Sequence, residues 1–120
     1  MERQSKNEKL LQYFKDICRI PRQTGDEEAI SQYLLDFAKA RGLQAERDAH
    51  HNVLIRKPST IPGYKGPTVI VQGHMDIVYE KSADSTHKYE DGIHVVEEDG
   101  YLKSADGTSL GADNGLAVAY

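Results

Sequence analysis

The sequence has little of what marks secreted, membrane or nucleic-acid-binding proteins. It contains one cysteine, Cys18, which cannot form an intramolecular disulfide. Its first residues are polar and charged, so neither a secretory signal nor a membrane span is predicted. The 15 Lys and Arg residues are interleaved with 19 Asp and Glu residues, and the net charge of -4 argues against a general nucleic-acid binder. We therefore expect a soluble, cytoplasmic protein of about one small domain.

Motifs of several enzyme classes are missing as well. The chain has no CxxC, no HExxH and no serine-centred nucleophile elbow. The glycines of residues 107–115 have neither the Lys-Ser or Lys-Thr of a phosphate loop nor the GxGxxG spacing of a dinucleotide site. This loop is therefore not predicted to bind phosphate.

Periodicity predicts two amphipathic helices at the start of the chain. Apolar residues recur at helical spacing from Lys6 to Arg19, and Pro21 ends that helix. Residues 24–27, Thr-Gly-Asp-Glu, match a capping box for a second helix. Gly42 supplies the C-terminal stop of that helix.

The remaining pattern predicts strands. Residues 43–48 and 53–56 are predicted to be two strands joined by a short polar loop, which favours a hairpin. Residues 68–71, Thr-Val-Ile-Val, form a continuous apolar run typical of a strand buried on both faces. Residues 92–96 and 101–103 flank an Asp-Gly pair, the signal of a second hairpin. The order of elements predicts an α/β fold with a mixed sheet.

His74 and Asp76 follow the apolar run directly. Residues two apart in an extended chain project to the same face, about 6 to 7 Å apart, so both side chains can reach one site. In open α/β sheets the functional crevice lies beyond the carboxyl ends of the strands. Asp76 is placed to hold one ring nitrogen of His74, as a metal-binding imidazole requires. The alternative is a loop histidine beside an aspartate that caps a turn.

Asp113 is a second candidate, in a loop whose glycines Gly107, Gly111 and Gly115 let the backbone approach an ion or a substrate closely. The alternative is that Asp113 or Asn114 is the N-cap of the helix that begins near Gly115.

The other histidines and the cysteine are predicted to be structural or solvated. His50 and His51 lie in a turn and His87 lies in a polar stretch, which favours exposed surface for all three. His94 alternates with apolar neighbours and is predicted on the outer face of a strand. Cys18 belongs to an apolar helical stripe and is predicted to be buried.

Five motifs in order give the chain a family resemblance that spans nearly all of its length. They are residues 20–22 (Ile-Pro-Arg), 26–28 (Asp-Glu-Glu), 52–58 (Asn-Val-Leu-Ile-Arg-Lys-Pro), 72–78 (Gln-Gly-His-Met-Asp-Ile-Val) and 107–115 (Gly-Thr-Ser-Leu-Gly-Ala-Asp-Asn-Gly). Together they resemble the aminoacyl-histidine dipeptidases, of the co-catalytic zinc peptidase superfamily that includes carnosinases, aminoacylases and carboxypeptidase G. The last motif is specific, because related tripeptidases typically have a second Asp where this chain has Asn114.

The resemblance implies a zinc site. His74 is then a ligand of one zinc ion, Asp76 is the catalytic-site carboxylate that orients it, and Asp113 bridges two zinc ions, with a cis peptide between Asp113 and Asn114. Zinc is the default metal for such ligands, and manganese or cobalt would also fit. The implied fold is a three-layer α/β/α catalytic domain, and the implied reaction is hydrolysis of dipeptides, of Xaa-His type or broader, by a metal-activated water.

Family members are several hundred residues long, so residues 1–120 are expected to be the N-terminal portion of the catalytic domain. The remaining ligands, the general base and an inserted dimerisation domain are then expected elsewhere in a homodimeric longer protein. The 120-residue chain by itself is expected to be inactive, to bind zinc weakly and to self-associate. The open alternatives are a sibling deacylase or tripeptidase and a non-catalytic α/β interaction domain.

Overall fold

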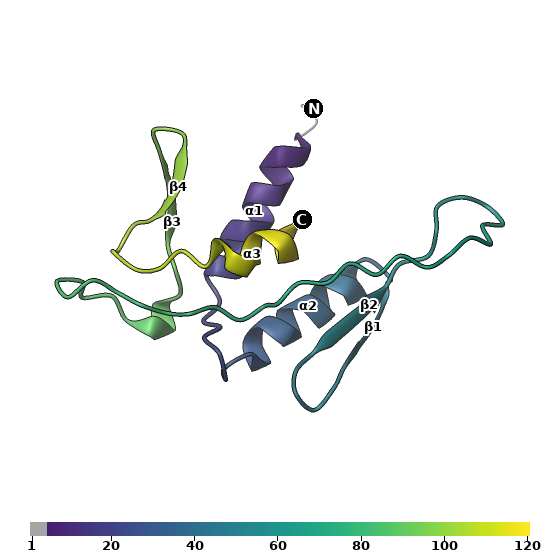
Figure 1. Cartoon of the computed structure of the whole chain (residues 1–120), viewed down its shortest axis with the longest axis horizontal. Coiled ribbons are helices and arrows are strands. Elements are labelled where there is room, and N and C mark those ends of the chain that lie inside the picture. The colour runs from purple at the N-terminus through teal and green to yellow at the C-terminus, as the bar shows by residue number, and fades with distance from the viewer. Residues whose placement is uncertain (1–4) are drawn as a thin grey trace. The chain divides into compact units, whose positions relative to one another are not determined.

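The computed structural model describes residues 5–120, which form two compact units (Figure 1). The first unit contains the chain up to Ile30 together with Gly73–Tyr120, and the second contains Ser31–Gln72. His74, Asp76 and Asp113 all belong to the first unit.

Helix α1, Lys6–Cys18, begins at a capping box that the sequence analysis did not identify. The Ser5 hydroxyl accepts the Glu8 N–H at 3.1 Å, and the Glu8 carboxylate accepts the Ser5 N–H at 2.8 Å. The helix buries Phe14 and Cys18, so the predicted stripe and the predicted burial of the cysteine are confirmed.

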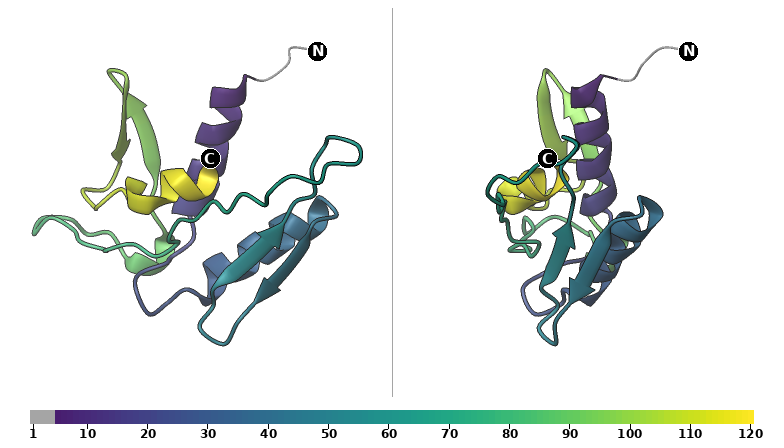
Figure 2. Two further views of the ribbon diagram at one scale, coloured as in Figure 1. Left: turned by 45° about the vertical axis from the view of Figure 1, so that its right-hand side comes forward. Right: turned by 90° about the vertical axis from the view of Figure 1, so that its right-hand side faces the viewer.

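The core of the first unit forms around these two residues. Phe14 and Cys18 cluster with Ile77 and Ile93, and helix α3, Ala112–Ala119, packs against α1 at this cluster (Figure 2). Burial raises the pKa of the Cys18 thiol above its usual range, because a low-dielectric interior disfavours the thiolate.

A hairpin completes the first unit. Strands β3, Val95–Glu98, and β4, Tyr101–Ser104, pair antiparallel, and a single turn of 3-10 helix, Tyr89–Asp91, precedes them. The connecting residues Asp99 and Gly100 both have positive φ, at 51° and 79°, as a tight hairpin turn requires. The predicted hairpin is therefore confirmed.

The second unit contains most of helix α2, Glu28–Ala40, followed by strands β1, Gln44–Arg47, and β2, Val53–Arg56. Gly42 ends the helix with φ of 66°, as predicted. The two strands pair antiparallel, and Arg47 donates a 3.0 Å hydrogen bond to the hydroxyl of the buried Ser31 on α2. The first predicted hairpin is thus confirmed.

The capping box predicted at residues 24–27 is wrong. Helix α2 begins at Glu28, and the Thr24 hydroxyl donates instead to the Asp76 carboxylate at 2.7 Å. Glu27 accepts the backbone N–H of Gly25 at 2.7 Å. The Thr24 hydroxyl, which the sequence pattern assigned to the N-terminus of a helix, therefore binds Asp76, 52 residues away.

The strand predicted at residues 68–71 is also not formed. The structure assigns no strand to these residues, and Val69, Ile70 and Val71 are 81%, 84% and 90% exposed. The α/β class itself is confirmed, with three α-helices and two antiparallel hairpins within residues 5–120. Among these residues, no helix has the length and apolar character that crossing a membrane needs.

We expect the 120-residue chain to self-associate through this exposed apolar segment, because extended apolar chain without a pairing partner is a template for intermolecular pairing. Ile70→Lys should weaken the association about tenfold or more, since burying an Ile side chain contributes about 1.5–3 kcal/mol. Light scattering across a concentration series measures the effect. Tyr101→Lys is the matched control, because Tyr101 is 70% exposed but lies in a paired strand. A monomeric wild-type chain would contradict the expectation.

Candidate functional site

The segment that carries His74 and Asp76 is fixed by the loop that follows α1. The N–H of Ile77 donates to the Arg22 carbonyl at 3.0 Å, and the N–H of Thr24 donates to the Ile77 carbonyl at 3.2 Å. These bonds form a short parallel bridge that holds the segment extended. His74 and Asp76 therefore face the same side, as their spacing predicted.

Asp113 reaches the same location from the turn that opens α3. Gly111 has φ of 75°, and Asp113 has non-helical angles of φ -88° and ψ 101°. The peptide between Asp113 and Asn114 is cis, as the family resemblance implied. The hydrogen bond of the Asp113 side chain goes to His74 and not to a backbone N–H of α3. The helix-cap alternative therefore does not describe this residue.

The imidazole of His74 lies between the two carboxylates. Its Nε2 atom is 3.0 Å from Asp113 Oδ1, and its Nδ1 atom is 3.1 Å from Asp76 Oδ1. The contact with Asp113 raises the pKa of His74 most strongly, and the contacts with Asp76 add to it, because carboxylates favour the charged ring. Since the His74 side chain is 51% exposed, water screens much of this attraction.

Asp76 is itself held by Thr24. The hydroxyl of Thr24 lowers the pKa of Asp76, and the bond from His74 lowers it further, so the carboxyl stays ionised. An ionised carboxylate is an acceptor only, so the ring donates its Nδ1–H to Asp76, while its Nε2 atom faces the Asp113 carboxylate. Sequence reasoning did not assign Thr24 to the site, because its match to a helix cap gave a sufficient local explanation.

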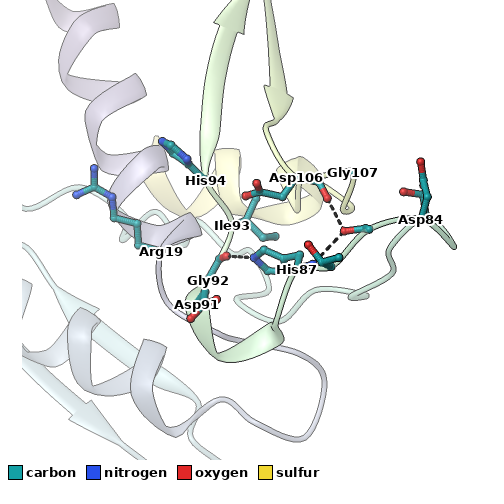
Figure 3. A pocket seen from close by; sticks show the side chains of 12 residues that line it. Arg19, Asp84, His87, Asp91, Gly92, Ile93, His94, Asp106 and Gly107 are labelled. Carbon is teal, nitrogen blue, oxygen red and sulfur yellow. Dashed lines mark hydrogen bonds between the residues drawn. The ribbon is translucent and has the colours of Figure 1, made fainter.

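These side chains line a pocket of about 270 Å³. Its walls are Thr24, His74, Asp76, Ile77, Val78, Ser109, Gly111 and Asp113. A larger pocket of about 860 Å³ lies elsewhere in the first unit and includes none of the three candidate residues (Figure 3). Its charged side chains are spread around the rim and do not converge on one point, so we assign the chemistry to the smaller pocket (Figure 3).

The predictions for the other histidines are partly confirmed and partly wrong. His50 is exposed, as predicted. His94 is exposed but precedes β3, so its predicted place on a strand is wrong, and His51 is half-buried with φ of 66°, against the prediction of exposed surface. The prediction of a solvated His87 is wrong: the ring is half-buried, with Nε2 2.6 Å from the Gly92 carbonyl (Figure 3). Its Nδ1 atom lies 2.7 Å from the Tyr79 hydroxyl, so both ring nitrogens have partners and the residue is structural.

The site holds only part of a metal ligand set. Within the described residues 5–120, no group of three or more His, Cys, Asp or Glu side chains is arranged to hold a metal ion. His74 Nε2 and the Asp113 carboxylate are two such donors, and Asp76 faces the other nitrogen of the same ring.

Comparisons with known proteins identify two relatives. No family model matches the sequence. The cytosol non-specific dipeptidase of Escherichia coli (strain K12) is 38% identical over 110 residues, which cover 92% of this chain and 23% of that protein. The crystal structure of aminoacylhistidine dipeptidase from Vibrio alginolyticus matches with a TM-score of 0.87 and 36% identity, over 95% of this chain and 23% of that one. The chain therefore spans 23% of the length of these relatives, and over that stretch its resemblance to the aminoacyl-histidine dipeptidases is confirmed in both sequence and structure.

Proposed function

We propose that the protein containing this chain is a metal-dependent peptidase that hydrolyses small dipeptides at a two-zinc site. The observation that carries the proposal is the 3.0 Å approach of His74 Nε2 to Asp113 Oδ1, from segments 39 residues apart. Two relatives described as dipeptidases support the same reaction class. Because the chain spans 23% of their length, the activity is proposed for the whole protein.

The residues fit zinc in the chemistry of their donors. Imidazole nitrogen and carboxylate oxygen are both zinc ligands, at about 2.0–2.2 Å from the ion. His74 Nε2 and Asp113 Oδ1 are 3.0 Å apart, so both donors could reach one ion. The Asp113 side chain is 92% exposed, which leaves its carboxylate open to a second ion. Manganese or cobalt would also suit this donor set.

In the proposed mechanism His74 Nε2 and the Asp113 carboxylate would hold the metal, and the exposed Asp113 carboxylate would also be available to a second ion. Bound zinc supplies a water that is acidic enough to lose its proton near neutral pH and a Lewis acid for the scissile carbonyl. Asp76 accepts a hydrogen bond from His74 Nδ1–H, which fixes the ring plane and would leave the Nε2 lone pair for the metal. Thr24 in turn fixes the Asp76 carboxylate by donating to its second oxygen.

We also propose, from the relative's description as a cytosol dipeptidase, that this protein acts in the cytoplasm on dipeptides. The homodimer is proposed from the family resemblance alone. A sibling deacylase or tripeptidase would use the same donors. The choice among these substrates depends on the residues around the small pocket and on parts of the protein outside residues 1–120.

The full-length protein should contain zinc and release amino acids from Xaa-His and other dipeptides. His74→Ala should remove most of the bound metal and lower kcat/KM at least about a thousandfold, because the metal loses an anchoring ligand. Metal analysis and a dipeptide assay measure both effects. His94→Ala is the matched control, since His94 is exposed and lies outside the site. Metal-free wild-type protein with full activity would exclude the two-zinc proposal.

Asp76→Asn should lower zinc affinity or activity about 10–100-fold, the usual effect of losing a carboxylate behind a ligand histidine. Thr24→Val should give a smaller loss in the same direction, because Asp76 keeps its bond to His74. Competition with a chromophoric chelator gives the affinities. Asp84→Asn provides the control, since Asp84 is an exposed carboxylate of the first unit. Equal affinity in the Asp76 and Asp84 variants would contradict the assigned role of Asp76.

The 120-residue chain alone should bind zinc weakly and hydrolyse no dipeptide. A stable zinc site usually takes three or four protein ligands, whereas His74 and Asp113 provide two. Isothermal titration with zinc tests this, with His74→Ala as the zero-binding reference. Tight binding of one or two zinc ions per wild-type chain would contradict this prediction, because it would show that these residues already form a complete zinc site.

A further inference from the structure

Arg22 is a buried cation whose contacts the proposed mechanism does not use. Its side chain is 0% exposed, and it is the largest fully buried side chain among residues 5–120. Its guanidinium donates to the Met75 carbonyl through Nη1 at 2.8 Å and to the Gly111 carbonyl through Nη2 at 3.1 Å. The Nε atom is buried without a hydrogen-bond partner. Neither hydrogen bond of the guanidinium ends on a carboxylate.

The two carbonyls belong to the two segments that carry the candidate ligands. Met75 lies between His74 and Asp76, and Gly111 lies two residues before Asp113. The backbone carbonyl of Arg22 also accepts the N–H of Ile77 at 3.0 Å. One residue therefore joins the extended His74 segment to the Asp113 turn, through both its main chain and its side chain.

The glycines of the Asp113 loop leave room for this guanidinium. A Cβ atom added at Gly115 would lie 2.6 Å from Arg22 Nη2 and 3.1 Å from the Phe14 ring. A Cβ atom added at Gly111 would lie 3.0 Å from the same Nη2 atom. Gly115 has no positive φ, so its backbone does not require glycine. Close approach of Arg22 is the reason that the structure gives for a glycine at position 115.

The chemistry of arginine suits this role better than that of an apolar residue. Burying a guanidinium costs free energy unless its N–H groups find acceptors. The planar fork of donors is rigid, so two carbonyls bound to different nitrogens are held at a set separation. A methionine or leucine would fill the space but would leave the Met75 and Gly111 carbonyls unjoined.

We propose that Arg22 is a positioning residue that sets the separation of His74 Nε2 and Asp113 Oδ1, and thereby the metal affinity of the site. This inference rests on the proposed metal-dependent function. It assigns a role to the Ile-Pro-Arg segment, which approaches the site from the loop between α1 and α2.

The contact between Arg22 and the glycine loop can be tested without metal by a double-mutant cycle. Gly115→Ala should destabilise the chain in the wild-type background, because the new methyl group collides with Arg22. In an Arg22→Ala background the same substitution should cost much less, since the collision with Arg22 is gone, the 3.1 Å approach to the Phe14 ring remains, and alanine favours a helix. Denaturant unfolding of the four proteins measures the coupling. Additive effects would overturn the proposed contact.

The positioning role is tested by zinc affinity in the full-length protein. Arg22→Ala should weaken binding about 10–100-fold, as loss of a supporting residue does at other metal sites. Arg22→Lys should recover part of that affinity, because lysine keeps the charge and can reach one carbonyl. Millimolar guanidinium ion should restore affinity to Arg22→Ala by occupying the vacated space. The absorption spectrum of the cobalt-substituted protein should shift in Arg22→Ala, because the ligand separation changes.

Ile17→Ala is the matched control, because Ile17 is a buried α1 residue, 2% exposed, that is not part of the core cluster containing Ile77. The positioning role would be overturned if Ile17→Ala weakened zinc binding as much as Arg22→Ala does and guanidinium did not rescue Arg22→Ala. A wild-type protein that binds no zinc would instead reject the proposed function. The double-mutant cycle would then still report whether Arg22 joins the two segments.

Discussion

The candidate site of the first unit depends on one contact between side chains, that of His74 with Asp113. Their reactive atoms are 3.0 Å apart although the residues are 39 positions apart in the sequence. Neither side chain is deeply buried, so their mutual attraction contributes little to folding. The backbone segments that carry His74 and Asp113 must therefore set the distance between the two side chains.

The loop between α1 and α2 provides that support. Within three residues it contributes a side chain that joins the two ligand segments, a main-chain bridge to Ile77, and a hydroxyl that fixes Asp76. Each of these contacts acts on a neighbour of the candidate ligands and leaves the ligand atoms free. The loop therefore positions the candidate ligands through their neighbours. The site itself remains open as a pocket of about 270 Å³.

The errors of sequence reasoning have a common cause. Residues 24–27 match a helix cap, yet Thr24 binds a carboxylate 52 positions away. His87 lies in a polar stretch, yet its ring is held by Tyr79 and by the Gly92 carbonyl. The apolar run 68–71 has the composition of a buried strand, but residues 5–120 provide no strand that pairs with it. In each case a partner outside the local sequence pattern, present or absent, decided the outcome.

The sequence by itself determined the helices, both hairpins and the shared face of His74 and Asp76, because these follow from side-chain period, turn residues and i, i+2 geometry. It also identified Asp113 as a candidate, through the motif that resembles a dipeptidase loop. Only the tertiary structure decided that Asp113 contacts His74 and that Thr24 donates a hydrogen bond to Asp76. It alone also showed that Arg22 donates to a carbonyl of each ligand segment. Those contacts join residues far apart in the chain, and no local pattern encodes the distance between them.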